Sequence, residues 1–264
     1  GKPLAGKSTL NRLELTPVRA DAGSRYKKIT VQRKAVQDFF VDAFLQAHES
    51  PPPWIILDLD ATDIPLHGHQ AGRFFHGYYD HYCYLPLYIF CGDHLLCAKL
   101  RPSNLDASTG TLKEVQRIVA AIRERFPTTP ILLRADSGFC REPIMAWCER
   151  YDVHYLLGLA KNDRLLREIA DELAQAKGRF EETGKPARVF KEFRYSTLDS
   201  WSGERRVIAK AEHLDKGSNP RFVVTSLPSD EFPAQATYEE TYCARGDMEN
   251  RIKEQQLGLF ADRT

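Results

Sequence analysis

Two short apolar runs that each end in an aspartate constrain the fold of this chain more than any other feature. Residues 54–60 read WIILDLD and residues 130–136 read PILLRAD. Each run has the length and the isoleucine and leucine content of a buried strand. A carboxylate at such a place is costly unless it is paired or binds a metal. The sequence therefore predicts two buried strands that deliver Asp60 and Asp136 to one edge of a sheet.

The first run contains a second aspartate, Asp58. Side chains alternate between the two faces of a strand, so Asp58 and Asp60 share one face. Periodicity alone therefore leaves both as candidates for a functional site.

The order of predicted elements indicates an α/β core with an inserted small β subdomain. Strands are expected at 54–60, 81–91, 94–100, 130–136, 154–159 and 221–227, and helices at 31–48, 111–126, 141–151, 163–177 and 236–257. Thr111-Leu-Lys-Glu114 has the pattern of a capping box. The polar stretch 178–218 has alternating runs typical of a β insertion. We expect a mixed sheet with helices on its faces.

Composition excludes several classes of protein. The 264 residues are 42% hydrophobic and 28% charged, with a mean hydropathy of −0.44, as in ordinary globular proteins. No apolar run approaches the length of a membrane span, so no membrane partner is expected. The six cysteines form no C-x-x-C pair, which favours reduced thiols in a cytoplasmic protein.

Positive charge is concentrated at the start of the chain. Residues 1–34 carry nine Lys and Arg against Glu14 and Asp21, a net +7, whereas the whole chain carries +1. A basic arm of this kind predicts a polyanionic partner, and a solvated basic surface is an equal alternative. The first residue, Gly1, is not a methionine, and we expect a piece of a longer protein.

The opening residues GKPLAGKS also fit the phosphate-binding loop of nucleotide hydrolases. In such proteins a buried strand precedes the loop, and no such strand precedes Gly1. A P-loop NTPase is therefore a weak alternative. Residues 7–12, KSTLNR, fit the start of a basic helix better, such as the second helix of a helix-turn-helix.

The last predicted helix carries four polar residues on one stripe. At about 100° per residue, Tyr242, Arg245, Glu249 and Lys253 fall within a narrow sector of the helix surface. Taken alone, this stripe is better interpreted as a salt-bridged surface face. Packed against the strand ends, however, the helix brings Glu249 to the two aspartates. Three carboxylates repel one another without a cation, whereas with Mg²⁺ they suit two-metal phosphoryl transfer.

Three motifs together resemble the signature of DDE insertion-sequence transposases. They are Asp60-Ala-Thr62, Asp136-Ser-Gly-Phe139 and Tyr242-x2-Arg245-x3-Glu249-x3-Lys253. The likeness is to the cut-and-paste group with a β insertion between the second aspartate and the glutamate. It covers residues 50–257 and implies a ribonuclease-H-like catalytic core.

The resemblance implies a role for each matching residue. Asp60, Asp136 and Glu249 become the catalytic, metal-binding triad for two Mg²⁺ ions, with Mn²⁺ as a substitute. Tyr242, Arg245 and Lys253 become contacts to DNA phosphates near the cleaved end. Further DNA contacts are expected in the basic arm, at Arg12, Lys27 and Lys28.

The implied partners are double-stranded DNA, as transposon ends and target, and a second copy of the chain in the DNA complex. The implied location is the bacterial nucleoid. Four segments are expected: a basic DNA-binding segment at 1–50, the first part of the core at 51–177, the insertion at 178–218, and the last core strand with the catalytic helix at 219–264. A catalytically inactive DNA-binding remnant is the alternative.

Three other features have a functional and a structural interpretation. The histidines at 67, 69, 76 and 81 fit no closed zinc ligand set, so a polar loop near the site is expected. Cys140 has no identifiable catalytic partner, and a small buried thiol is the better prediction. Trp201, in the insertion, either stacks on a displaced base or packs locally, and packing is favoured.

Overall fold

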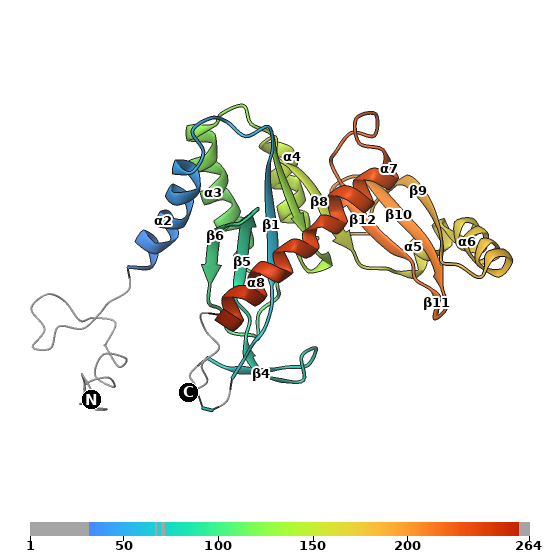
Figure 1. Cartoon of the computed structure of the whole chain (residues 1–264), viewed down its shortest axis with the longest axis horizontal. Helices are drawn as coiled ribbons and strands as arrows, with labels where there is room; N and C mark the ends of the chain where they lie inside the picture. The colour runs from blue at the N-terminus through green and yellow to red at the C-terminus, as the bar shows by residue number, and fades with distance from the viewer. Residues whose placement is uncertain (1–31, 67, 70–71, 259–264) are drawn as a thin grey trace, which may run out of the picture.

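A computed structural model describes residues 32–66, 68–69 and 72–258 (Figure 1). Within these ranges nine strands form one mixed sheet in the order β11-β10-β12-β8-β7-β1-β5-β6, with β9 paired to β10. The strands are β1 (Ile55–Ala61), β5 (Leu87–Cys91), β6 (His94–Lys99), β7 (Ile131–Ala135), β8 (His154–Leu159), β9 (Ala187–Tyr195), β10 (Arg205–Leu214), β11 (Gly217–Ser218) and β12 (Arg221–Thr225).

The middle of this sheet fits the ribonuclease-H-like core that the family resemblance implies. Strand β1 pairs antiparallel with β5, which pairs antiparallel with β6. On its other side β1 pairs parallel with β7, and β7 pairs parallel with β8. The predicted mixed sheet flanked by helices is therefore confirmed.

The strands of the stretch predicted as an insertion continue the same sheet. Strand β12 pairs antiparallel with β8, and β10 pairs antiparallel with both β12 and β9. The helix α6 (Ala170–Thr183) packs against β9 and β10 and lies at the far end of the sheet in Figure 1. The sheet thus runs unbroken from the core into the inserted strands.

Strand alternation assigns each residue of β1 to one of two faces. Ile55, Leu57 and Leu59 join the main apolar core with the helices on one side. These helices are α2 (Arg33–Gln46), α3 (Thr111–Arg125), α4 (Glu142–Arg150) and α5 (Asp163–Glu168). Asp58 and Asp60 consequently face the other side, which the C-terminal helix crosses (Figure 1). No helix in the described part of the chain is long and apolar enough to span a membrane.

The C-terminal helix is less regular than predicted. The structure divides it into α7 (Ala234–Ala236), a π-helical turn η2 (Thr237–Tyr242), a 3-10 turn η3 (Cys243–Arg245) and α8 (Gly246–Gly258). The prediction of one regular helix over 236–257 is therefore wrong across η2 and η3. In a π turn the hydrogen bonds span one residue more than in an α-helix, which shifts every later side chain around the axis.

The predicted capping box at α3 is also wrong. Gly110 precedes the helix with a left-handed φ of 76° and gives no side-chain cap, and Thr111 is already helical. Glu114 does not reach back to the helix start because Lys99 and Arg117 hold it at 2.7 and 3.2 Å. The Glu114 carboxylate, which the local pattern predicts to cap the helix, forms ion pairs with residues of the tertiary structure and the next helix turn instead.

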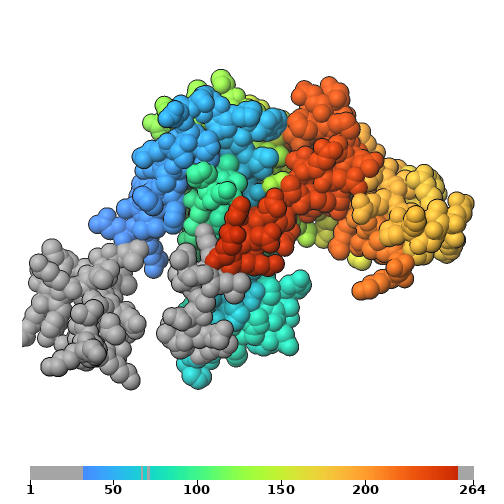
Figure 2. All heavy atoms as spheres, in the orientation of Figure 1, coloured from blue at the N-terminus to red at the C-terminus, as the bar shows by residue number. Residues whose placement is uncertain are grey.

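A second, three-stranded sheet interrupts the strand predicted over 81–91. It contains β2 (Ile64–Pro65), β3 (Phe74–His76) and β4 (His81–Tyr84) in the order β2-β4-β3. Pro86 lies between β4 and β5, where its missing N–H donor suits a break in the strand. In Figure 2 this small sheet, in teal, stands out from the body below the end of α8.

Candidate active site

A buried ion pair separates the two aspartates of β1. Asp58 lies opposite Arg134 in the β1–β7 register, and its two oxygens accept from Arg134 Nε and a terminal nitrogen at 2.5 and 2.7 Å. Arg134 also donates to the carbonyl of Thr241 in the π-helical turn. Burial raises the pKa of Asp58, and Arg134 opposes that shift. Both oxygens of Asp58 are thus used in an ion pair with Arg134, which links the sheet to the C-terminal helix.

A pocket of about 660 Å³ opens where β1 and β7 end beneath α8. Asp60, Asp136, Glu249 and Lys253 all line this pocket, so the structure brings four of the predicted site residues together. Asp60 and Asp136 each lie two residues beyond the Asp58–Arg134 pair, on the same face of the sheet. Side chains of the small sheet and its turn form another part of the wall.

Arg245 lies between two of the pocket carboxylates. Its guanidinium is 3.1 Å from Glu249 and 4.0 Å from Asp60. Burial raises the pKa of Asp60 to about 6, Arg245 opposes this rise, and the charge of Asp136 adds to it. One arginine therefore does not compensate the negative charge gathered in the pocket.

Asp136 is fixed by a short turn at the end of β7. Its carboxylate accepts from the backbone N–H of Gly138 at 2.9 Å and so caps the 3-10 turn η1 (Ser137–Phe139). A Cβ on Gly138 would lie 3.0 Å from an oxygen of Asp136 and 3.3 Å from Ala107. The glycine of the Asp-Ser-Gly-Phe motif therefore leaves room for the aspartate to cap its own turn.

Tyr242 lies beside the pocket and not in its lining. It lines an adjoining pocket of about 410 Å³ together with Asp136 and Ser137. A Cβ on Gly158 of β8 would lie 2.6 Å from the Tyr242 hydroxyl and 2.8 Å from the Ser137 nitrogen. Sequence reasoning missed Gly158, and an isolated glycine within an apolar strand was the available signal for a close approach.

The charge and chemistry of the pocket suit a hard cation. Carboxylate oxygens are the ligands that Mg²⁺ prefers, and Asp60, Asp136 and Glu249 could supply them. Across the described residues, no three His, Cys, Asp or Glu side chains lie close enough together to hold a metal ion. One oxygen of Glu249 is held by Arg245 at 3.1 Å.

The remaining predicted residues divide into those that are described and those that are not. Arg12, Lys27 and Lys28 lie outside the described residues, as do the whole GKPLAGKS stretch and the histidine at 67. His81 pairs with Asp63 at 2.6 Å. Cys140, predicted to be a small buried thiol, is half-buried, and burial raises its pKa to about 11.

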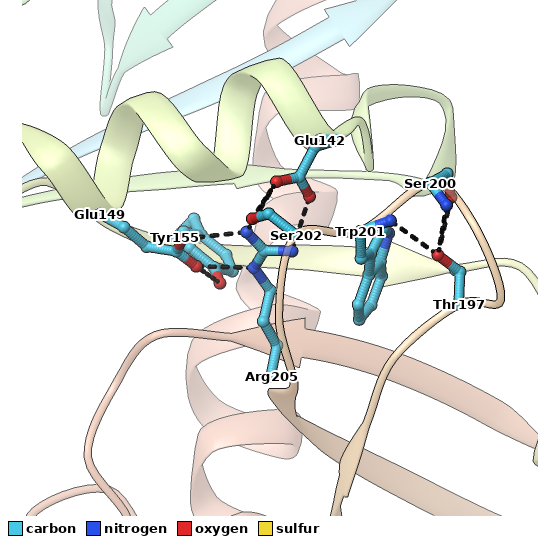
Figure 3. Close-up of polar contacts among 8 residues, drawn as sticks. All are labelled: Glu142, Glu149, Tyr155, Thr197, Ser200, Trp201, Ser202 and Arg205. Atoms are coloured by element: carbon cyan, nitrogen blue, oxygen red, sulfur yellow. Dashed lines mark hydrogen bonds and ion pairs between the residues drawn. The ribbon is translucent and has the colours of Figure 1, made fainter.

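Trp201 packs locally, as favoured from the sequence. Its ring lies edge-on to Tyr195 at 5.8 Å, and the guanidinium of Arg205 lies 5.4 Å from its centre. Figure 3 shows the indole beside the ion pairs of Arg205 with Glu142 and Glu149. This tryptophan is part of a structural cluster.

Comparison with known proteins agrees with the family resemblance. No curated protein matches the chain. Among solved structures, the chain is similar to a piggyBac transposase in a cryo-EM synaptic complex with hairpin DNA, at 11% identity and a TM-score of 0.45. That match covers 83% of this chain and 44% of the other, so the chain spans less than half of that protein. A family model described as transposase DDE domain group 1 matches residues 1–264, and the chain therefore belongs to this family of transposase DDE domains.

Proposed function

We propose that this chain is the catalytic core of a DNA transposase that cleaves and joins strands at insertion-sequence ends. One observation carries the proposal. Asp60 and Asp136 end neighbouring parallel strands on the same face of the sheet and share a pocket with Glu249 of the C-terminal helix. Converging carboxylates of this kind suit metal-assisted phosphoryl transfer.

Asp60, Asp136 and Glu249 are the proposed ligands of two Mg²⁺ ions, with Mn²⁺ as a substitute. The raised pKa of Asp60 supports this. Burial and the neighbouring carboxylates destabilise its ionised form, and a bound cation would stabilise that form. When bound, the ions supply a more acidic attacking water or DNA 3′-hydroxyl and stabilise the leaving oxygen.

The basic residues of the helix are proposed to hold DNA phosphates. Arg245 presents a fork suited to bidentate phosphate contacts, and Lys253 is an exposed cation on the pocket wall. Tyr242 can donate its hydroxyl from the adjoining pocket. When a DNA phosphate binds Arg245, it replaces the 3.1 Å hydrogen bond from Arg245 to Glu249. Both oxygens of the Glu249 carboxylate are then available to bind the same ions as the two aspartates.

The wider assembly is also proposed. Double-stranded DNA is the partner, as transposon ends and target, and two copies of the chain act in the DNA complex at the bacterial nucleoid. Residues 1–50 form the DNA-binding segment, with contacts at Arg12, Lys27 and Lys28. Residues 51–177 and 219–264 form the catalytic core around the 178–218 insertion.

The test is cleavage of DNA that carries the element's own ends by the full-length protein, with Mg²⁺, Mn²⁺ or EDTA. Glu249→Gln is expected to lower the cleavage rate by at least about 100-fold, because it removes a charged ligand at the reacting phosphate. Glu254→Gln is the matched control. It lies on the same helix, contacts Arg251 and does not line the pocket, so its rate should stay within twofold of wild type.

Two results overturn the proposal. Cleavage by the Glu249→Gln variant at the wild-type rate removes the glutamate from the mechanism. A wild-type protein that binds the ends and never cuts them with Mg²⁺ or Mn²⁺ is an inactive DNA-binding remnant.

A further inference from the structure

We infer that Tyr78, on the turn of the small sheet, is a stacking platform for an unpaired DNA base next to the phosphate held in the carboxylate pocket. This rests on the proposed function and adds a binding element to the same site. Tyr78 lines the pocket together with Asp60 and Glu249. Tyr78 is 86% exposed, more than any other large hydrophobic residue in the described part of the chain.

The turn that carries Tyr78 is anchored to the site through a neighbouring tyrosine. Tyr79 also lines the pocket, and its hydroxyl lies 3.4 Å from the carbonyl oxygen of Ala61, the residue after Asp60. The ring of Tyr79 packs on His76 at 4.9 Å. These contacts hold the base of the turn at the carboxyl end of β1.

The backbone of the turn fixes the direction in which Tyr78 projects. Asp80 has a φ of 56°, a left-handed conformation that few residues other than glycine adopt. Its N–H donates to the carbonyl of His76 at 2.8 Å and closes the loop. Tyr78 and Tyr79 pack edge to face, with ring centres 5.0 Å apart, while Tyr78 stays largely exposed.

The surrounding surface fits a single nucleic-acid strand. On the adjacent strands Phe75 and Tyr82 are 54% and 46% exposed and form a cross-strand pair, and Arg73 lies 4.4 Å from the centre of the Tyr82 ring. Exposed rings with interleaved cations are the features that bind single strands, because bases stack on the rings while cations hold phosphates. Lys253 supplies a further cation at the pocket itself.

An unpaired base is the occupant that this geometry favours. Bases inside a duplex are stacked on both faces and cannot cover the exposed ring of Tyr78. A base displaced next to the cut site has a free face within reach of the turn. The small sheet stands out from the body in Figure 2, so a strand that enters the pocket can pass along it.

The experiment measures binding in EDTA, where cleavage does not occur. The full-length protein is titrated into two end duplexes, one fully paired and one with an unpaired 2-aminopurine beside the cleavage position. Wild type should bind the unpaired probe more tightly and quench its fluorescence. Tyr78→Ala should weaken that binding by about 5- to 150-fold and abolish the quenching, in line with the loss of one stacked base.

Three comparisons make the result specific. Tyr78→Phe keeps the ring and should stay within twofold of wild type. Tyr151→Ala removes an exposed tyrosine at the end of α4, away from the pocket, and should have no effect. Binding of the fully paired duplex should change less than twofold in all variants.

The inference is overturned if Tyr78→Ala binds and quenches the unpaired probe as wild type does. It is also overturned if this variant loses both duplexes equally, since that indicates a general phosphate contact. In either case a loss of cleavage in Glu249→Gln still supports the proposed function, so the two failures are distinguishable. Failure of wild type to bind either duplex contradicts both.

Discussion

Two arginine–carboxylate clusters on this sheet differ in how completely their charges are satisfied. Arg205 forms four hydrogen bonds of 2.6–3.2 Å with Glu142 and Glu149, which also accept from Ser202 and Tyr155 (Figure 3). Arg245 makes one bond to Glu249 at 3.1 Å and lies 4.0 Å from Asp60. The carboxylates around Arg205 are thus fully hydrogen-bonded, whereas those around Arg245 are only partly paired.

The pKa values of the two clusters shift in opposite directions. Hydrogen bonds from Arg205 lower the pKa of Glu149. At Glu142 burial alone would raise the pKa, but hydrogen bonds from Arg205 and Ser202 and the charge of Arg205 together outweigh it, so this pKa is also lowered. In the pocket, burial raises the pKa of Asp60 to about 6 despite Arg245. The first cluster is therefore a structural clamp between α4 and β10, and the second has negative charge left to bind a cation.

The most severe test of this contrast is Arg205→Met. It leaves two carboxylates without their common partner, so the free energy of unfolding should fall by about 2–4 kcal/mol. Denaturant titration measures the loss. Arg194→Met, which removes an exposed arginine from β9, should change the stability by less than about 0.5 kcal/mol. Equal losses in both variants contradict the idea of a clamp.

The second test is Glu149→Gln, which should cost about 1–3 kcal/mol at pH 7. A carboxylate with a lowered folded pKa stabilises the fold above its unfolded value of 4.5 and loses this contribution as the pH falls through the folded value. The difference between wild type and variant should therefore shrink below pH 4.5. A difference that is constant from pH 7 to pH 3 assigns the effect to packing.

The third test adds Mg²⁺. A cation that binds only the folded protein stabilises it by about 1.4 kcal/mol at ten times its dissociation constant, so the melting temperature should rise. Asp136→Asn should remove most of this rise, whereas Glu142→Gln should lower the starting stability and keep the rise. A Mg²⁺ response that survives Asp136→Asn places the ion elsewhere.

The smallest expected effect is that of Asp60→Asn without divalent ions. The raised pKa of Asp60 means that its charge destabilises the fold above about pH 6, so the neutral amide should gain up to about 1 kcal/mol at pH 7.5. The gain should develop between the unfolded pKa of 3.8 and the folded value of about 6, and it should vanish well below pH 3.8, where the carboxyl is protonated in both states. A loss of stability at pH 7.5 shows that the Arg245 contact already compensates the charge.

The sequence predicts the strands of this protein better than its helix ends. Residues 154–159 form β8 with the expected bounds because a continuous apolar run has no other stable place than the sheet interior. Glu114, in α3, fits a capping box by local pattern, yet it pairs with Lys99 of β6. Such contacts depend on the tertiary structure and leave no local pattern.

The same distinction applies to the candidate site. Asp136 and Glu249 are candidates from the sequence because an apolar run ends at the first and a polar helix stripe contains the second, and the motifs of the family resemblance add Asp60. Strand periodicity does not distinguish Asp58 from Asp60, because the difference depends on Arg134, which pairs with Asp58 from 76 residues away. The sequence does not indicate the π-helical turn at Thr237–Tyr242 either, since the register of this turn depends on a packing surface that forms only in the folded chain.

The place of α8 at the end of the described chain has a consequence for synthesis. Asp60 lies in β1 and Asp136 directly follows β7, whereas Glu249 leaves the ribosome more than a hundred residues after Asp136. At about 5–20 residues per second, translation of that interval takes roughly 5–20 s. In the proposed mechanism the nascent chain therefore cannot cleave DNA until α8 has docked on the sheet and supplied Glu249.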